Sequence, residues 1–423
     1  MVNSVRPAGS PETNTLWPAN PQQAEEFYKS LHRELTKSSA QLSQFWPTPE
    51  NLKKLFSPYV LKIPKTVLHQ AQEVIHELWC LSRDPDYQGF VLQRSPEIAH
   101  HSTSASGVLM AYDFHLNEKS ELRLIEVNTN ASGFLFADPL YKVLGRPAPS
   151  EIAHKDPIES LLQSFAQDYS LFYGRSDFLN SRMAIVDENL FEQKMLPEFY
   201  LYQNFFENQG IQCTLVDLKD LSKTQRGGAD FQFIYNRHTD FYLADKKSEA
   251  LRKAYLEDLS CLSPHPRVYA LLADKGRMID WQRPQKDFPS LPFSVTEKLL
   301  STQLLKEPHG ASDPEVIWQQ RKNLFFKPKR SHGGKQVYRG ASLSRKMFEK
   351  LTQETEILVQ EFFPPGPPPF DGPLQPENKK SWKYDLRFYA YEDHLQLAVG
   401  RLYQGQVTNF HTDFGGFTAL TFY

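Results

Sequence analysis

The sequence predicts a multidomain protein that combines an α/β unit with α+β lobes. Its 423 residues are enough for two or three domains, and a 40% hydrophobic and 13% aromatic content is enough to fill their cores. The apolar periodicity also changes along the chain, from helical spacing near the N-terminus to strand–helix alternation in the middle and strand hairpins near the C-terminus.

The first hundred residues are predicted to form a tail followed by helices. Residues 1–20 are rich in Pro, Ser and Asn, which is typical of a loose tail. Within residues 21–104, the segments 24–42 and 65–81 repeat apolar side chains every three or four positions. We therefore expect a helical N-terminal region that carries no chemistry of its own.

Residues 105–178 are predicted to form a strand hairpin and a helix. The apolar segments 108–116 and 122–130 flank the polar residues 117–121, a pattern typical of two strands joined by a short turn. Residues 158–172 return to helical spacing.

Residues 179–275 are predicted to form a small parallel α/β domain. Strand-like segments at 182–188, 212–218 and 231–236 alternate with a helix at 196–210. This alternation favours a doubly wound sheet. We expect residues 265–272 to add a further strand.

Residues 276–423 are predicted to form α+β lobes. A strand at 323–329 runs into a glycine-containing loop, and a helix and a second strand follow. Residues 383–403 are typical of a long hairpin that turns at Glu392–His394. The proline-rich residues 363–379 are expected to be a solvated insertion, with a lid as the alternative.

Composition excludes several classes of protein. The formal net charge of −2 argues against a general nucleic-acid binder. No segment approaches the ~20 consecutive apolar residues of a membrane helix, and the first residues lack the apolar core of a secretory signal. We expect a cytoplasmic protein, and leave a homodimer open. The three cysteines show neither metal-ligand nor disulfide spacing.

The predicted early hairpin carries three oxygen-bearing side chains. Glu126 and Asn128 are two apart on one strand and so share a face, and Asp113 lies on the partner strand. Together they suit a magnesium ion whose remaining ligands are phosphates. An ordinary polar strand surface is the alternative.

Two further groups of basic residues suggest phosphate chemistry. Lys327 ends an apolar strand directly before a loop containing Gly333 and Gly334, whose backbone could approach phosphates closely. On the C-terminal hairpin, Arg387 and Arg401 could converge and neutralise a phosphoryl group or a carboxylate. A glycine turn and a salt-bridged sheet face are the respective alternatives.

The motifs KPxxxxGG, ILVQEF, DLRFY and IEVN together resemble those of the ATP-grasp ligases. The IEVN motif here precedes KPKRSHGG by about two hundred residues. This order resembles the circularly permuted branch, which includes the eukaryotic-type glutathione synthetases and a group of uncharacterised bacterial proteins. The resemblance covers roughly residues 105–423 and implies an ATP-grasp fold in which residues 179–275 are the pre-ATP-grasp domain.

The resemblance also implies roles for individual residues. It assigns Mg²⁺ to Asp113, Glu126 and Asn128, and the γ-phosphate and acyl substrate to Arg387 and Arg401. It assigns ATP to eight residues, which are Lys275, Lys327, Ser331, Gly333, Gly334, Gln336, Gln360 and Glu361. The family's phosphate loop carries an acidic metal ligand where this chain has Ser331 and His332, and we expect Asp113 to supply the missing carboxylate.

The resemblance implies an ATP- and magnesium-dependent ligase that joins a carboxylate to an amine or thiol through an acyl phosphate. Its substrates would be amino acids, peptides or similar small molecules. Asn236 and Arg237 follow a strand of the parallel unit, at the edge where open α/β sheets bind ligands. We expect them to contact substrate, and a helix-capping or loop role is the alternative. Two other functions stay open, a small-molecule kinase and a non-catalytic nucleotide-binding or partner module.

Overall fold

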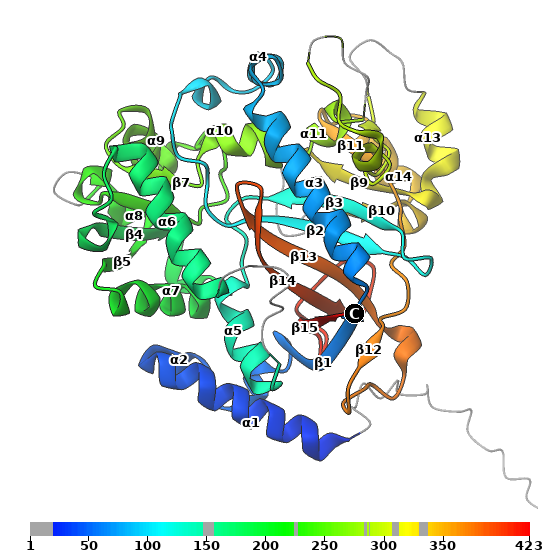
Figure 1. The fold of residues 1–423 in the computed structure, drawn as a ribbon. Helices are drawn as coiled ribbons and strands as arrows, with labels where there is room; N and C mark the ends of the chain where they lie inside the picture. Colours follow the sequence, from blue (N-terminus) through cyan, green and yellow to red (C-terminus); the bar gives the residue numbers. More distant parts are fainter. Residues whose placement is uncertain are drawn as a thin grey trace, which may run out of the picture.

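The computed structural model describes residues 20–146, 156–223, 227–282, 286, 288–306, 313–329 and 337–423. These residues form a mixed α/β architecture with three sheets and surrounding helices (Figure 1). No helix in these ranges is both long enough and apolar enough to cross a bilayer.

The largest sheet contains strands from both ends of the chain. Its seven strands lie in the order β12-β1-β15-β14-β13-β2-β3, and only β1 and β15 pair in parallel. The strands in this order are Phe370–Asp371, Phe56–Ile63, Gly416–Phe422, His394–Tyr403, Lys383–Tyr391, Met110–Leu116 and Leu122–Asn128. Both predicted hairpins are confirmed. The early hairpin β2–β3 lies directly beside the late strand β13, so residues about 270 positions apart become neighbours.

The second sheet has four antiparallel strands in the order β10-β9-β11-β8. These strands are Tyr338–Arg339, Leu324–Pro328, Ile357–Glu361 and Thr302–Leu304. Helices α13 (Pro314–Gln320) and α14 (Arg345–Leu351) bury Ile317 and Phe348 against it. The backbone N–H of Leu124 in β3 donates to the carbonyl of Lys298 at 2.8 Å, which ties this lobe to the edge of the large sheet.

The third sheet is parallel, in the order β5-β4-β6-β7, as predicted for a doubly wound unit. Its strands are Gln212–Asp217, Arg182–Asp187, Phe233–Asn236 and Cys261–Ser263. Three helices pack against this sheet, namely α6 (Pro157–Tyr173), α7 (Leu196–Asn208) and α9 (Glu249–Leu256). Figure 1 shows this unit beside the large sheet.

Two element predictions are wrong. Residues 265–272 do not form a strand, because His265 caps a helical turn at Pro266–Val268 that continues as a π-helix over Tyr269–Ala273. Proline at the first helical position favours this start. The N-terminal region is also not wholly helical, because β1 is a nearly fully buried strand of the large sheet. Its helices are α1 (Pro21–Ser38), α2 (Ala40–Phe45), α3 (Lys65–Arg83) and α4 (Pro85–Leu92).

The proline-rich segment is anchored along the large sheet. Its residues Phe370 and Asp371 form the edge strand β12, and the N–H of Gly366 donates to the carbonyl of Leu116 at 2.8 Å.

Helix α5 (Phe134–Val143) follows the β2–β3 hairpin and contacts both α1 and β15. The N-terminal helices thus complete the core around the large sheet.

Candidate functional site

The charged side chains of the two hairpins meet on one face of the large sheet. Asp113 lies opposite Glu126 on one side and opposite Arg387 on the other, and Asp385 lies opposite Arg401. Residues directly opposite in antiparallel strands project to the same face. The register therefore brings the predicted metal residues and the predicted arginines together.

Asp113 is the centre of this cluster. Its Oδ1 accepts from Nε of Arg387 at 2.7 Å, and its Oδ2 accepts from Nη2 of Arg387 at 2.7 Å and Nη2 of Arg401 at 2.9 Å. Burial by itself would raise the pKa of Asp113, but the two guanidinium groups lower it well below its usual range. Asp113 is therefore an ionised carboxylate that holds two arginines.

Arg401 is fixed from a second side. Its Nε donates to Oδ1 of Asp385 at 2.7 Å, and the hydroxyl of Thr408 hydrogen-bonds the other oxygen of that carboxylate. The cluster thus holds its arginines in set orientations before any ligand arrives, which is the arrangement that electrostatic catalysis requires.

Two lysines approach the same face from other parts of the chain. Lys327 in β9 is 5% exposed, and its Nζ donates to Oε1 of Gln360 at 2.8 Å and to the carbonyl of Ile125 at 3.4 Å. Nζ of Lys275 lies 3.9 Å from Oε2 of Glu126. The early hairpin and the late lysine strand therefore share one site.

The electrostatics at Lys327 favour an anion. Burial lowers the pKa of Lys327 to about 8, the Glu126 carboxylate opposes this shift, and the Lys275 ammonium adds to it. A buried ammonium close to a second ammonium is stabilised when a negative ligand joins it. Phosphate oxygens meet this requirement.

Lys275 is positioned by its neighbours in a tight turn. Oδ1 of Asp274 accepts from the N–H of Gly276 at 2.9 Å, and Oδ2 of Asp274 accepts from the Tyr242 hydroxyl at 2.9 Å. The turn directly follows the π-helix, so this helix sets where Lys275 enters the site.

Gln360 and Glu361 have different surroundings although they are adjacent. Gln360 is 3% exposed and joins Lys327 to the Thr302 hydroxyl, to which its Nε2 donates at 3.2 Å. Glu361 is exposed and accepts from the N–H of Ser301 at 3.4 Å. Ser331, Gly333, Gly334 and Gln336 lie outside the described residues. The strands that flank them, β9 and β10, are paired, with Tyr338 opposite Phe326.

Glu126, whose carboxylate lies near Lys275, and Asn128 beside it are the two side chains that could hold a magnesium ion. Asp113 differs from the expectation, because the arginines engage both of its oxygens. Nδ2 of Asn128 donates to Oδ2 of Asp113 at 3.1 Å and lies 3.5 Å from Oε1 of Glu126, so the amide would have to make a half-turn to present its oxygen to a metal. No group of three His, Cys, Asp or Glu side chains that could hold a metal converges anywhere in the described ranges, this site included. One or two protein oxygens suffice for magnesium when phosphates complete its octahedron.

Asn236 and Arg237 are brought near the site, but their side chains are engaged by the protein. Arg237 is 6% exposed and hydrogen-bonds the carbonyls of Asn130 and Ala131 and the side chain of Ser132. Nδ2 of Asn236 donates to the carbonyl of Pro264 at 3.3 Å. Arg237 thus clamps the loop after β3 to the parallel domain.

Sequence reasoning missed the residues on the other side of this loop. The carbonyl of Ser132 accepts from the Tyr389 hydroxyl at 2.6 Å and from Nη1 of Arg387 at 3.2 Å. The N–H of Gly133 donates to buried Glu198 at 2.6 Å. Gly133 has a φ of +108°, so a glycine at this point of the NASG segment was the one available signal.

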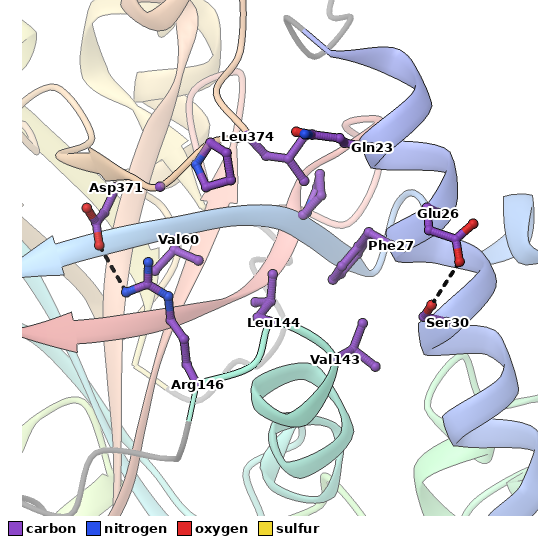
Figure 2. A pocket seen from close by; sticks show the side chains of 13 residues that line it. Gln23, Glu26, Phe27, Ser30, Val60, Val143, Leu144, Arg146, Asp371 and Leu374 are labelled. Atoms are coloured by element: carbon purple, nitrogen blue, oxygen red, sulfur yellow. Dashed lines mark hydrogen bonds and ion pairs between the residues drawn. The ribbon is translucent and has the colours of Figure 1, made fainter.

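A cavity of about 320 Å³ lies elsewhere, between α1, β1, the end of α5 and β12 (Figure 2). At one end Nη1 of Arg146 pairs with Oδ2 of Asp371 at 3.0 Å, and Phe27 and Leu144 supply apolar walls. Since none of the predicted site residues lines this cavity, it is not the candidate site.

No known family model matches the chain, and no curated protein matches it. Among solved structures, the fold is similar to that of a candidate gamma-glutamylcysteine synthetase from Methylobacillus flagellatus KT. The TM-score is 0.44 at 10% sequence identity, over 85% of this chain and 89% of the other. A likeness this distant carries no argument about fold or function.

Proposed function

We propose that the protein is an ATP- and magnesium-dependent ligase that joins a carboxylate to an amine or thiol through an acyl phosphate. The observation that carries the proposal is the convergence of Lys275 and Lys327 on Glu126, beside two arginines that Asp113 holds in place. The substrates would be an amino acid, a peptide or a similar small acid, together with an amine.

The chemistry explains why such a site needs no side-chain nucleophile. A carboxylate is a poor electrophile at neutral pH, and transfer of the γ-phosphoryl group of ATP makes it reactive. Phosphoryl transfer is accelerated mainly by positioning and charge stabilisation. Fixed ammonium and guanidinium groups provide both.

Each group then has a part in this mechanism. Lys275 and Lys327 would bind the phosphates, and Gln360 would keep the Lys327 ammonium aimed at them. Glu126 and Asn128 would hold the magnesium ion, which when bound neutralises phosphate charge. Arg401 and Arg387 would stabilise the acyl phosphate and the oxyanion formed when the amine attacks.

The test is ADP release by the purified protein with ATP, Mg²⁺ and pools of amino acids, acids and amines. Glu126→Gln and Lys327→Ala should each abolish release without unfolding the protein. Glu118→Gln and Lys119→Ala, exposed on the β2–β3 turn, are matched controls that should keep it.

Three outcomes would separate the alternatives. ADP and phosphate formed only when acid and amine are both present would support the ligase. A stable phosphorylated product would support a kinase instead, and absence of nucleotide binding in calorimetry would leave a non-catalytic module. Full turnover by both site variants would refute the assignment of residues.

A further inference from the structure

A second pair of basic side chains lies where the seven-stranded sheet and the antiparallel four-stranded sheet approach each other. Arg339 ends β10 in the four-stranded sheet, and Lys383 begins β13 in the seven-stranded sheet. Nζ of Lys383 donates to the carbonyl of Gly405 at 2.5 Å. The next residue, Gln406, donates to the hydroxyl of Ser342, three positions after Arg339, at 2.8 Å. These contacts join the loop after β14 both to Lys383 and to the turn after Arg339, so the two cations lie on adjoining segments.

This pair has no acidic partner among the described residues. Neither Arg339 nor Lys383 forms an ion pair in those ranges, and Nε of Arg339 is buried without a hydrogen-bond partner there. Burial and the charge of Arg339 both lower the pKa of Lys383. The carboxylate on the same strand, Asp385, is engaged by Arg401 and Thr408.

Holding two like charges together without an acid is unfavourable unless an anion joins them. The guanidinium of Arg339 is also fixed, because it stacks over the Phe362 ring at 4.5 Å from the centroid. A planar, oriented guanidinium beside a flexible ammonium is well suited to a carboxylate.

The pair is aligned with the proposed reaction site. Lys383 and Arg387 are four residues apart on β13, so their side chains share one face. At roughly 3.4 Å per residue, their Cα atoms are about 14 Å apart. A small molecule with an acidic group at each end could contact both.

We propose that Arg339 and Lys383 form a subsite for a second carboxylate of the acid substrate, which would make that substrate a dicarboxylic acid or an acidic peptide. This inference rests on the proposed function, because it places the activated carboxylate at Arg387 and Arg401. Lys275 and Lys327 would then bind the triphosphate of ATP.

Binding can be tested by calorimetry with glutarate and pimelate, and with butyrate as the monocarboxylate. The wild-type protein should bind the diacids about tenfold or more tightly than the monoacid, and Arg339→Gln and Lys383→Gln should each remove that difference. Arg345→Gln and Lys379→Gln, exposed cations outside the subsite, are the controls. Equal binding of diacids by the subsite variants and the wild type would overturn the proposal.

Two further arms separate this proposal from the proposed function. Lys327→Ala should lose ATP turnover yet keep diacid selectivity, since the subsite does not include Lys327. A fluorescent ATP analogue should bind the Arg339→Gln and Lys383→Gln variants as it binds the wild type. A large loss of its affinity would assign the pair to the nucleotide and overturn the substrate assignment.

Discussion

Arg387 donates two hydrogen bonds to Asp113, from Nε to Oδ1 and from Nη2 to Oδ2, and each measures 2.7 Å. The two residues lie directly opposite each other on β13 and β2, and both are buried. This bidentate pair joins an early strand to a late one, and Arg401 binds the same carboxylate. Because so much of the site depends on this pair, its removal should affect both stability and activity.

Arg387→Met should destabilise the protein by about 3–5 kcal/mol, because it leaves the buried Asp113 carboxylate with only one of its two guanidinium partners. Urea unfolding followed by circular dichroism measures this change. Arg345→Met is the control, because Arg345 pairs at the surface with Glu315 and Glu349 and its loss should cost at most about 1 kcal/mol. Equal urea midpoints for the two variants would show that the buried Arg387–Asp113 pair contributes nothing to stability.

Nucleotide binding should take up protons near pH 8. The pKa of Lys327 is lowered to about 8 by burial, so the free lysine is half protonated there, and a bound phosphate favours the charged form. The pKa therefore rises on binding, and about half a proton should be taken up at pH 8. Affinity should fall as the pH rises further.

Calorimetry in buffers of different ionisation enthalpy counts these protons. Lys327→Arg should bind nucleotide without taking up protons, because a guanidinium stays charged at this pH. Uptake of the same size in that variant would mean that another group titrates.

Gly133→Ala should strongly destabilise the loop after β3. Its backbone φ is +108°, and an added Cβ would lie 2.4 Å from the Phe417 ring and 2.6 Å from the Tyr389 hydroxyl. Gly145→Ala is a control with a positive φ of +64° and open space, so it should show only the conformational penalty of about 1 kcal/mol. If thermal unfolding shows that Gly133→Ala and Gly145→Ala lose the same amount of stability, close packing at Gly133 is unimportant.

Arg237→Met should reduce stability by about 3 kcal/mol and lower kcat as well, because Arg237 holds the loop whose Ser132 carbonyl positions Arg387. Arg182→Met, at the exposed start of β4, is the control. A direct substrate contact would instead raise KM and leave the unfolding midpoint unchanged. Steady-state kinetics combined with thermal unfolding distinguishes these results.

The β2–β3 hairpin, the β13–β14 hairpin and the parallel unit could be predicted because each is built from local patterns, namely alternation, turn residues and strand–helix spacing. The strand β1 was missed because FSPYVLKI is a nearly continuous apolar run, and its strand partners β15 and β12 lie more than three hundred residues away. Residues 265–272 were misassigned because their apolar run also suits a helical turn that His265 caps.

The sequence by itself predicted phosphate and metal roles, for Glu126, Asn128 and Lys327 from local patterns together with the family resemblance, and for Lys275 from that resemblance alone. Only the tertiary structure decided how Asp113 is used. Its two guanidinium partners come from strands about 270 and 290 residues away, and their charges and hydrogen bonds occupy the carboxylate that sequence reasoning had assigned to magnesium. Local patterns specify strands and turns, but the partner of a buried charge depends on which strands the fold places side by side.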